Sequence, residues 1–200
     1  MAKAWSSREK ELIKNSLRNE GRKLFEKYGI RKTTLDDIVR SAGISKGAFY
    51  FFYQSKEELF FDILESLERD YKTRIYGNIF LPGVSRRDSF RQFFKNLIDI
   101  LKEVPLFGSM NPTDYEYLMR KLPDKKLTGH IDTDFSELAF LFSPWMDKGW
   151  IKRVNLKALS GLMLSLFYFI IHRGDIGEID FDGTKELLID MLTDYLVLEE

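Results

Sequence analysis

The sequence contains no cysteine and only two histidines among its 200 residues, and these scarcities exclude several kinds of catalytic and metal-binding site. Without cysteine there is no disulfide framework, no thiolate nucleophile and no Cys-ligated metal site. His130 is expected in a turn, and His172 near a helix C-terminus, where a cation is favoured. Phosphate-binding Gly-Lys loops and nucleophile elbows are also missing. We therefore expect no enzyme activity, no metal site and no cofactor.

Long apolar runs are also lacking. The fully uncharged segment 158–171 has 14 residues, whereas a membrane-spanning helix needs about 20. This segment is therefore expected to be buried in protein, with no membrane partner. The opening residues MAKAWSSREKE lack the apolar stretch of a signal peptide, so a cytoplasmic location is expected.

An excess of charge of one sign is absent as well, with 31 Lys and Arg against 31 Asp and Glu. Nucleic-acid-binding domains usually have a basic excess, so the zero total argues against such a partner. Residues 1–56, however, hold 13 basic and six acidic residues, a net charge of +7, and residues 57–200 carry −7. The asymmetry predicts a basic part that faces a polyanion, with a solvated basic helix face as the alternative.

Three helices are predicted in the basic segment. Apolar residues at helical spacing indicate a first helix over residues 7–28, and Gly29 stands where it would stop. Thr33 or Thr34 caps a short second helix that Gly43 ends. Ser45 caps a third helix that runs to about residue 52. Two short helices joined by a tight turn containing glycine form a helix-turn-helix.

The third helix has the residue types that a major groove requires near its N-terminus, which are small, polar or basic. Lys46 and Tyr50 offer an ammonium and a hydroxyl to phosphates, and Gly47 and Ala48 leave room for close approach. Two aromatic residues, Phe49 and Tyr53, are expected to turn into the small core. Phe51 either meets a thymine methyl group or simply packs, and both alternatives stay open.

The run Ser-Lys-Gly-Ala-Phe-Tyr over residues 45–50, followed by Ser-Lys-Glu-Glu-Leu over residues 55–59, resembles the N-terminal domain of TetR/AcrR-type transcriptional regulators. The resemblance covers about 50 residues, from the first helix to Leu59. It implies phosphate contacts by Thr34, Lys46, Tyr50 and Lys56. Two departures from the family pattern are Ala48, where Thr or Ser is common, and the pair Phe51-Phe52, where His or Tyr is common. The DNA-binding candidates are Thr33, Thr34, Ser45, Lys46, Gly47, Ala48, Tyr50, Phe51 and Lys56.

The acidic remainder also shows helical periodicity, so an all-α fold is expected. We predict a helix-turn-helix domain over residues 1–55 and a helical effector-binding and dimerisation domain over residues 56–200. Further helices are expected from Lys56, from Arg87 to a stop at Pro105, from Pro112, and from a cap at Thr133. The acidic stretch 174–183 lacks the calcium-loop pattern and is expected to be a solvated loop.

Two long apolar helices are expected over residues 156–171 and 180–198. Together they have more apolar surface than one small bundle needs to cover its core. A twofold four-helix interface is therefore predicted, as the resemblance also implies. A monomer in which the two helices pack internally is the alternative. The dimerisation candidates are Leu159, Leu162, Leu166, Leu188, Leu192 and Tyr195.

Aromatic residues are frequent in the middle helices, where such stripes are ordinarily core. The resemblance implies a cavity there for a small apolar or aromatic effector, with candidates Tyr76, Phe90, Phe94, Tyr117, Trp145 and Tyr168. The expected function is a ligand-responsive regulator that binds a double-stranded, pseudo-palindromic DNA operator as a homodimer. The expectation that it represses transcription comes from the family resemblance alone. The alternative is an all-helical small-molecule binding protein or enzyme whose N-terminal unit serves protein contacts.

Overall fold

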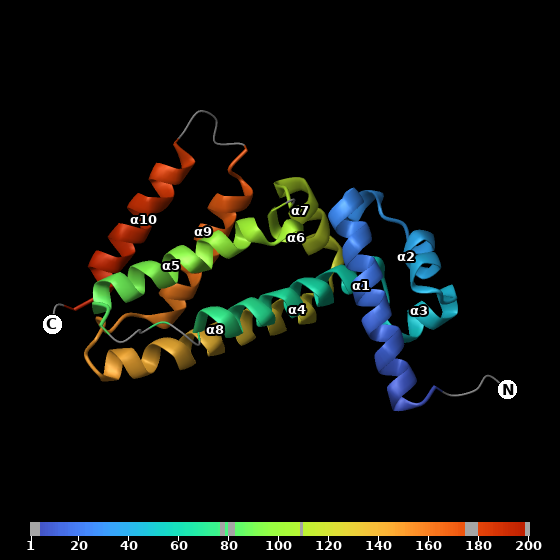
Figure 1. The fold of residues 1–200 in the computed structure, drawn as a ribbon, viewed down its shortest axis with the longest axis horizontal. Coiled ribbons are helices and arrows are strands. Elements are labelled where there is room, and N and C mark those ends of the chain that lie inside the picture. Colours follow the sequence, from blue (N-terminus) through green and yellow to red (C-terminus); the bar gives the residue numbers. More distant parts are fainter. Residues whose placement is uncertain (1–4, 77–78, 80–82, 109, 175–179, 199–200) are drawn as a thin grey trace. The chain divides into compact units, whose positions relative to one another are not determined.

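The computed structural model describes residues 5–76, 79, 83–108, 110–174 and 180–198 (Figure 1). Within these ranges the only β contact is an isolated antiparallel bridge between Ile151 and Val197, and the predicted all-α fold is confirmed. The helices are α1 (Ser7–Lys32), α2 (Leu35–Ala42), α3 (Lys46–Phe52), α4 (Lys56–Tyr76), α5 (Arg86–Glu103), α6 (Pro105–Gly108), α7 (Pro112–Lys121), α8 (Asp124–Asp147), α9 (Leu156–Ile171) and α10 (Phe181–Leu196).

The chain divides into two compact units by its internal contacts. Unit 1 comprises residues 1–69 and 105–122, and unit 2 comprises residues 70–104 and 123–200. The helix α4 contributes to both units. The functional division between residues 55 and 56 stays a prediction.

Helix α1 begins with a capping box, in which the Ser6 hydroxyl accepts from the Glu9 N–H at 3.2 Å. The Glu9 carboxylate accepts in return from the Ser6 N–H at 2.8 Å. Gly29 has a φ of 76°, which is outside the helical region, so the predicted break is confirmed there. One more helical turn follows and ends at Lys32, beyond the predicted end.

Unit 1 is built around α1, which packs against α2, α6 and α7, while α2 packs against α3 (Figure 1). Phe25 of α1 meets Phe60 of α4 edge to face, with ring centroids 4.9 Å apart. A Cβ atom on Gly21 would lie 3.0 Å from Leu59 Cδ2. Glycine at this position therefore allows α1 and α4 to approach closely.

Unit 2 is a helical layer in which α5 packs against α9 and α10, and α8 packs against α9. Its core is strongly aromatic, because α5 contributes Phe90, Phe93 and Phe94 and α8 contributes Phe142 and Trp145. The Phe90 and Trp145 rings lie 5.0 Å apart in an edge-to-face arrangement. Such pairs stabilise a core beyond the area that they bury.

Helix α8 begins nine residues before the predicted cap, so the prediction of a start at Thr133 is wrong. The Thr133 hydroxyl donates to the Gly129 carbonyl at 2.9 Å inside the helix, instead of capping a new one. His130, predicted in a turn, also lies within α8. Pro105 follows the end of α5 as expected, but it immediately opens the short helix α6.

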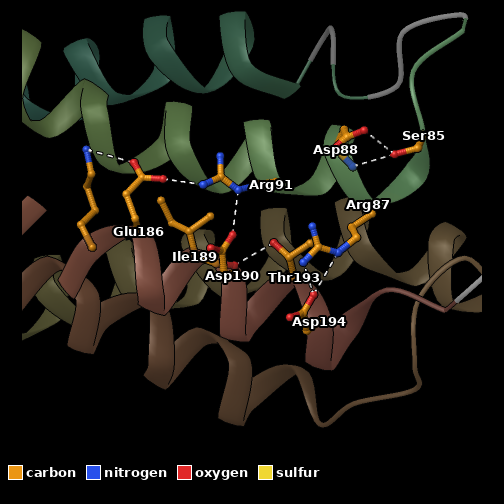
Figure 2. Close-up of polar contacts among 10 residues, drawn as sticks. Ser85, Arg87, Asp88, Arg91, Glu186, Ile189, Asp190, Thr193 and Asp194 are labelled. Atoms are coloured by element: carbon orange, nitrogen blue, oxygen red, sulfur yellow. Dashed lines mark hydrogen bonds and ion pairs between the residues drawn. The ribbon is translucent and has the colours of Figure 1, made fainter. Parts of the chain in front are cut away.

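Ion pairs join α5 to α10 along one side of unit 2 (Figure 2). Arg91 donates to Asp190 Oδ1 at 2.7 Å and to Glu186 Oε2 at 2.6 Å, and these hydrogen bonds raise the pKa of its guanidinium. One turn earlier, Arg87 pairs with Asp194. These contacts fix the register of α10 on α5.

The C-terminal helices leave apolar surface open in the single chain. Leu162, Leu164 and Tyr168 of α9 are exposed, so the expectation that this helix is buried all round is not met within one chain. No helix in the described ranges has the length and hydropathy that a membrane crossing requires. Asp180 caps α10 by accepting from the Gly183 N–H at 2.8 Å, whereas residues 175–179 of the predicted acidic loop lie outside the described residues.

Candidate nucleic-acid interface

The turn between α2 and α3 is fixed by local hydrogen bonds. Thr34 caps α2, since its hydroxyl accepts from the Asp37 N–H at 3.2 Å. Gly43 ends this helix with a φ of 68°, and the Ile44 N–H donates to the Val39 carbonyl at 3.0 Å. Ser45 then caps α3 by accepting from the Ala48 N–H at 3.2 Å. The predicted helix-turn-helix is therefore present, with both caps at predicted residues.

Helix α3 has one buried and one exposed face. Phe49 and Tyr53 are buried, as predicted. Tyr50 and Phe51 are each 57% exposed. Gly47 faces open space, because a Cβ atom there would meet only Ser45 Oγ at 3.9 Å. Ala48, in contrast, is buried, so its side chain does not lie on the exposed face.

Lys46 already has a charged partner in the free protein. Its Nζ lies 2.8 Å from Asp36 Oδ1, and both side chains are exposed. The hydrogen bond to Asp36 raises the pKa of the Lys46 ammonium. The ammonium therefore stays charged, and a phosphate would have to compete with Asp36 for it.

Two of the candidate residues lie at the junction of α1 and α2 instead of on the α3 face. Thr33 is buried, and its hydroxyl donates to the Gly29 carbonyl at 2.8 Å. Lys56 Nζ donates to the carbonyls of Ile30 and Thr33 at 2.7 Å each, and to Arg31 at 3.3 Å. Burial lowers the pKa of the Lys56 ammonium. Both side chains thus hold the end of α1 in place.

The C-terminal end of α3 is anchored by a charged network. Arg18 of α1 donates to both Asp62 carboxylate oxygens of α4, at 2.7 and 2.8 Å. The Tyr53 hydroxyl donates to Asp62 Oδ2 at 2.5 Å. Burial alone would raise the pKa of the Asp62 carboxyl, but the hydrogen bonds from Arg18 and Tyr53 hold it below its usual value.

Trp5 contacts the exposed face of α3, although the sequence patterns did not identify it as a candidate residue. Trp5 packs against both Phe51 and Phe52, with ring centroids 5.4 and 5.8 Å apart. A large apolar residue directly before the helix cap Ser6 was the available clue. Helical periodicity does not reveal it, because Trp5 lies outside the helix.

The structure brings together four of the six effector candidates. Phe90, Phe94 and Trp145 belong to the aromatic core of unit 2, and Tyr76 is partly buried against it. Tyr117 lies in unit 1, where its hydroxyl donates to Glu57 Oε1 at 2.6 Å. Burial and this hydrogen bond raise the pKa of Tyr117 to about 12. A cavity of about 200 Å³ in unit 1 involves none of these six, and is lined by Phe25, Glu26, Lys27, Gly29, Ile30, Phe60, Leu106, Met110 and Asp114.

Tyr168, the remaining effector candidate, is exposed on α9 and stacks on His172 with ring centroids 6.4 Å apart. The dimerisation candidates likewise divide between core and surface. Leu159, Leu166 and Leu192 are buried in unit 2, and Leu188 packs against that core. Leu162 and Tyr195 are exposed, as are three apolar residues that were not predicted, Leu164, Leu187 and Met191.

Residues 17–63 match the family model described as "Bacterial regulatory proteins, tetR family". The HTH-type transcriptional regulator YuxN of Bacillus subtilis (strain 168) is 31% identical over 134 residues, which are 63% of this chain and 44% of YuxN. This chain therefore spans less than half of that relative in the match. The HTH-type transcriptional regulator AcrR of Shigella flexneri is 32% identical over 63 residues, covering 28% of this chain and 29% of AcrR.

Solved structures share the fold over nearly the whole chain. A TetR-family transcriptional regulator from Pectobacterium atrosepticum aligns with a TM-score of 0.64 and 16% identity, covering 98% of this chain and all of the other. RolR in complex with resorcinol aligns with a TM-score of 0.65 and 16% identity, covering 94% of this chain and 88% of RolR. The matched family domain, residues 17–63, contains the helix-turn-helix with α3, and these similarities support a transcriptional regulator of the TetR/AcrR type.

Proposed function

We propose that this chain binds a pseudo-palindromic DNA operator as a homodimer, represses transcription there, and is released by a small apolar or aromatic effector. The observation that carries the proposal is the exposed face of α3, where Lys46, Tyr50 and Phe51 stand on a helix capped and anchored at both ends. A recognition helix inserts such a face into the major groove.

Charge supports a DNA partner for the N-terminal segment. Residues 1–56 carry a net charge of +7, and contacts from Lys and Arg to phosphates supply most of the sequence-independent affinity for DNA. The Tyr50 hydroxyl stands on a rigid stem that suits a phosphate oxygen. Two copies of α3 would read half-sites about one helical turn apart.

Exposed apolar residues on α9 and α10 support the dimer. Leu187, Met191 and Tyr195 follow one another at four-residue spacing on α10, and each is at least 59% exposed. Leu162 and Leu164 are exposed on α9. Two helices with open apolar faces suit a four-helix interface between identical subunits.

An aromatic core in unit 2 supports the apolar effector. Phe90 meets Phe142 and Trp145 edge to face, and aromatic side chains with few polar groups are typical of small-molecule sites. RolR, which shares the fold, was solved with resorcinol bound. By analogy, we propose a small aromatic or apolar compound as the effector, acting by favouring one of two arrangements of the chain.

Selection of bound sites from random DNA tests the proposal. We expect a twofold-symmetric site and an affinity that falls steeply with salt. Lys46→Ala should weaken binding to the operator and lower its salt slope by about one, and it should weaken binding to random DNA less, because Asp36 competes with phosphate for the ammonium. Tyr50→Ala should weaken binding by about tenfold or more, the loss expected for a hydrogen bond to a charged group.

Lys125→Ala is a matched control, because it removes the same charge from an exposed position on α8. It should leave both the affinity and the salt slope unchanged. If the protein binds no DNA at low salt, the proposal fails, and the small-molecule binding protein becomes the better interpretation.

A further inference from the structure

Three aromatic rings form a closed cluster on the exposed side of unit 1. Trp5 lies edge-on to Phe51 and stacks on Phe52, at an interplanar angle of 23° in the second contact. Phe51 and Phe52 meet edge to face with centroids 5.1 Å apart. Each ring therefore contacts the other two, although Trp5 is distant from the two phenylalanines in sequence.

Phe51 is held in place without being buried. The Lys10 ammonium lies 5.0 Å from the centre of its ring, and Trp5 and Phe52 contact it. More than half of its surface nevertheless faces solvent. A phenylalanine that packed for stability alone would bury most of its ring, so the fixed and exposed ring indicates a surface prepared for contact.

The chemistry of the ring identifies its partner in the major groove. Phenylalanine has no hydrogen-bonding group, and the apolar group that base edges present there is the C5-methyl of thymine. We propose that Phe51 reads a thymine methyl in each half-site, and that Trp5 is a positioning residue that holds the Phe51 ring for this contact. The inference rests on the proposed function and adds the base specificity of α3.

The contribution of this methyl contact to the affinity for DNA can be predicted. Burial of one methyl group contributes roughly 0.8 kcal/mol, which corresponds to about fourfold in affinity. Tyr50 has the same exposed fraction on the same helix, but we assign its hydroxyl to a phosphate. Loss of Tyr50 should therefore weaken binding to all sequences equally.

Replacing thymine by uracil in the selected operator removes only the methyl group. We expect the wild-type protein to bind about fourfold more weakly when one particular thymine of a half-site is replaced. Phe51→Ala should bind the thymine and uracil sites equally, and Phe51→Leu should keep a preference for thymine. Tyr50→Ala should lower both affinities and keep their ratio.

The positioning role of Trp5 is tested by the same ratio of affinities for the thymine and uracil sites. Trp5→Ala should reduce the preference for thymine while the salt slope, which counts phosphate contacts, stays unchanged. Trp5→Phe should restore the preference, since it returns a ring to the cluster. Thermal unfolding of each variant shows whether unit 1 is intact, and the wild-type comparison of thymine with uracil needs no variant.

The outcomes separate this inference from the proposed function. Operator binding with equal affinity for thymine and uracil at every position overturns the inference and leaves the proposed function standing. A preference that survives in Phe51→Ala also overturns it. An unchanged preference in Trp5→Ala overturns the role of Trp5. If no DNA binds at all, both proposals fall together.

Discussion

Arg18 and Asp62 form a bidentate ion pair between α1 and α4, and Tyr53 at the end of α3 donates a third hydrogen bond to the same carboxylate. The side chains are 23% and 17% exposed, so water screens the pair only partly. This carboxylate links the end of α3 to the two helices that support it.

Replacing Asp62 should therefore destabilise unit 1. We expect Asp62→Asn to lower the free energy of unfolding by about 2 kcal/mol, because it leaves the Arg18 guanidinium without a charged partner. Tyr53→Phe removes one hydrogen bond and should cost about 1 kcal/mol. Urea denaturation measures both values, and equal stability of all three proteins would contradict this account.

The Asp62 contribution should depend on pH. The folded protein holds the pKa of this carboxyl below the ordinary value of 3.8, so its contribution is complete above that value. It is lost as the pH falls through the lower folded pKa. The stability difference between wild type and Asp62→Asn should therefore be constant from pH 7 to about 5 and shrink below 3.8. A difference that grows in acid would contradict the sign.

Two lysines of the predicted interface should behave differently. Lys56→Met removes the donor to three carbonyls at the end of α1, so we expect a loss of about 1–3 kcal/mol in the free energy of unfolding. Lys46→Ala removes an exposed charge and should leave thermal unfolding unchanged while weakening DNA binding. If Lys56→Met unfolds like wild type and only DNA binding falls, Lys56 serves the phosphate contact instead.

The hydroxyl of Ser89 is buried in α5 without a hydrogen-bond partner among the described residues. Ser89→Ala removes this unsatisfied group, so it should leave the free energy of unfolding unchanged or raise it by up to about 1 kcal/mol. The matched control is Thr193→Val, in which a buried hydroxyl that donates to the Ile189 carbonyl at 2.7 Å is lost. That variant should be about 1 kcal/mol less stable. Equal destabilisation by both changes would show that Ser89 has a partner.

Arg91 joins α5 to two carboxylates of α10 (Figure 2). Arg91→Ala should lower the free energy of unfolding by about 0.5–1 kcal/mol at low salt, and high salt should reduce that loss. Arg153→Ala breaks the more exposed pair with Asp147 and should change stability by no more than a few tenths of a kcal/mol. A salt-independent effect at Arg91 would indicate packing by its stem, not charge.

The exposed stripe of α10 predicts the result of a sedimentation experiment. We expect the wild type to be a dimer at micromolar concentration and Met191→Glu to be a folded monomer, since a charge at this exposed position is costly only in an interface. Phe140→Glu, at the 85% exposed position of α8, should remain a dimer. Leu192→Glu should unfold unit 2, because Leu192 is buried. A monomeric wild type would contradict the interface.

Local patterns predicted the helix-turn-helix in detail. Thr34, Gly43 and Ser45 act through hydrogen bonds to their own neighbours, so the short-range sequence determines where α2 and α3 begin and end. The start of α8 was predicted wrongly because the local signal at Thr133 is ambiguous. A threonine hydroxyl can cap a helix or donate to the carbonyl four residues earlier, and Thr133 does the second.

Long-range contacts were beyond the sequence patterns. Nothing in periodicity links Trp5 to Phe51, or Lys56 to the carbonyl of Ile30, because these pairs meet only through the tertiary fold. In α9, apolar residues occur on all sides, so the pattern did not distinguish buried Leu166 from exposed Leu164.

The ion pair between Asp36 and Lys46 changes what a phosphate contact would contribute. A carboxylate on α2 already occupies the place that a phosphate would take, so binding exchanges one anion for another and returns Asp36 to water. Random DNA then gains little from this lysine. An operator that holds α3 deep in the groove through base contacts has other energy to drive the exchange. A single acidic residue can thereby widen the gap between specific and non-specific affinity without touching a base.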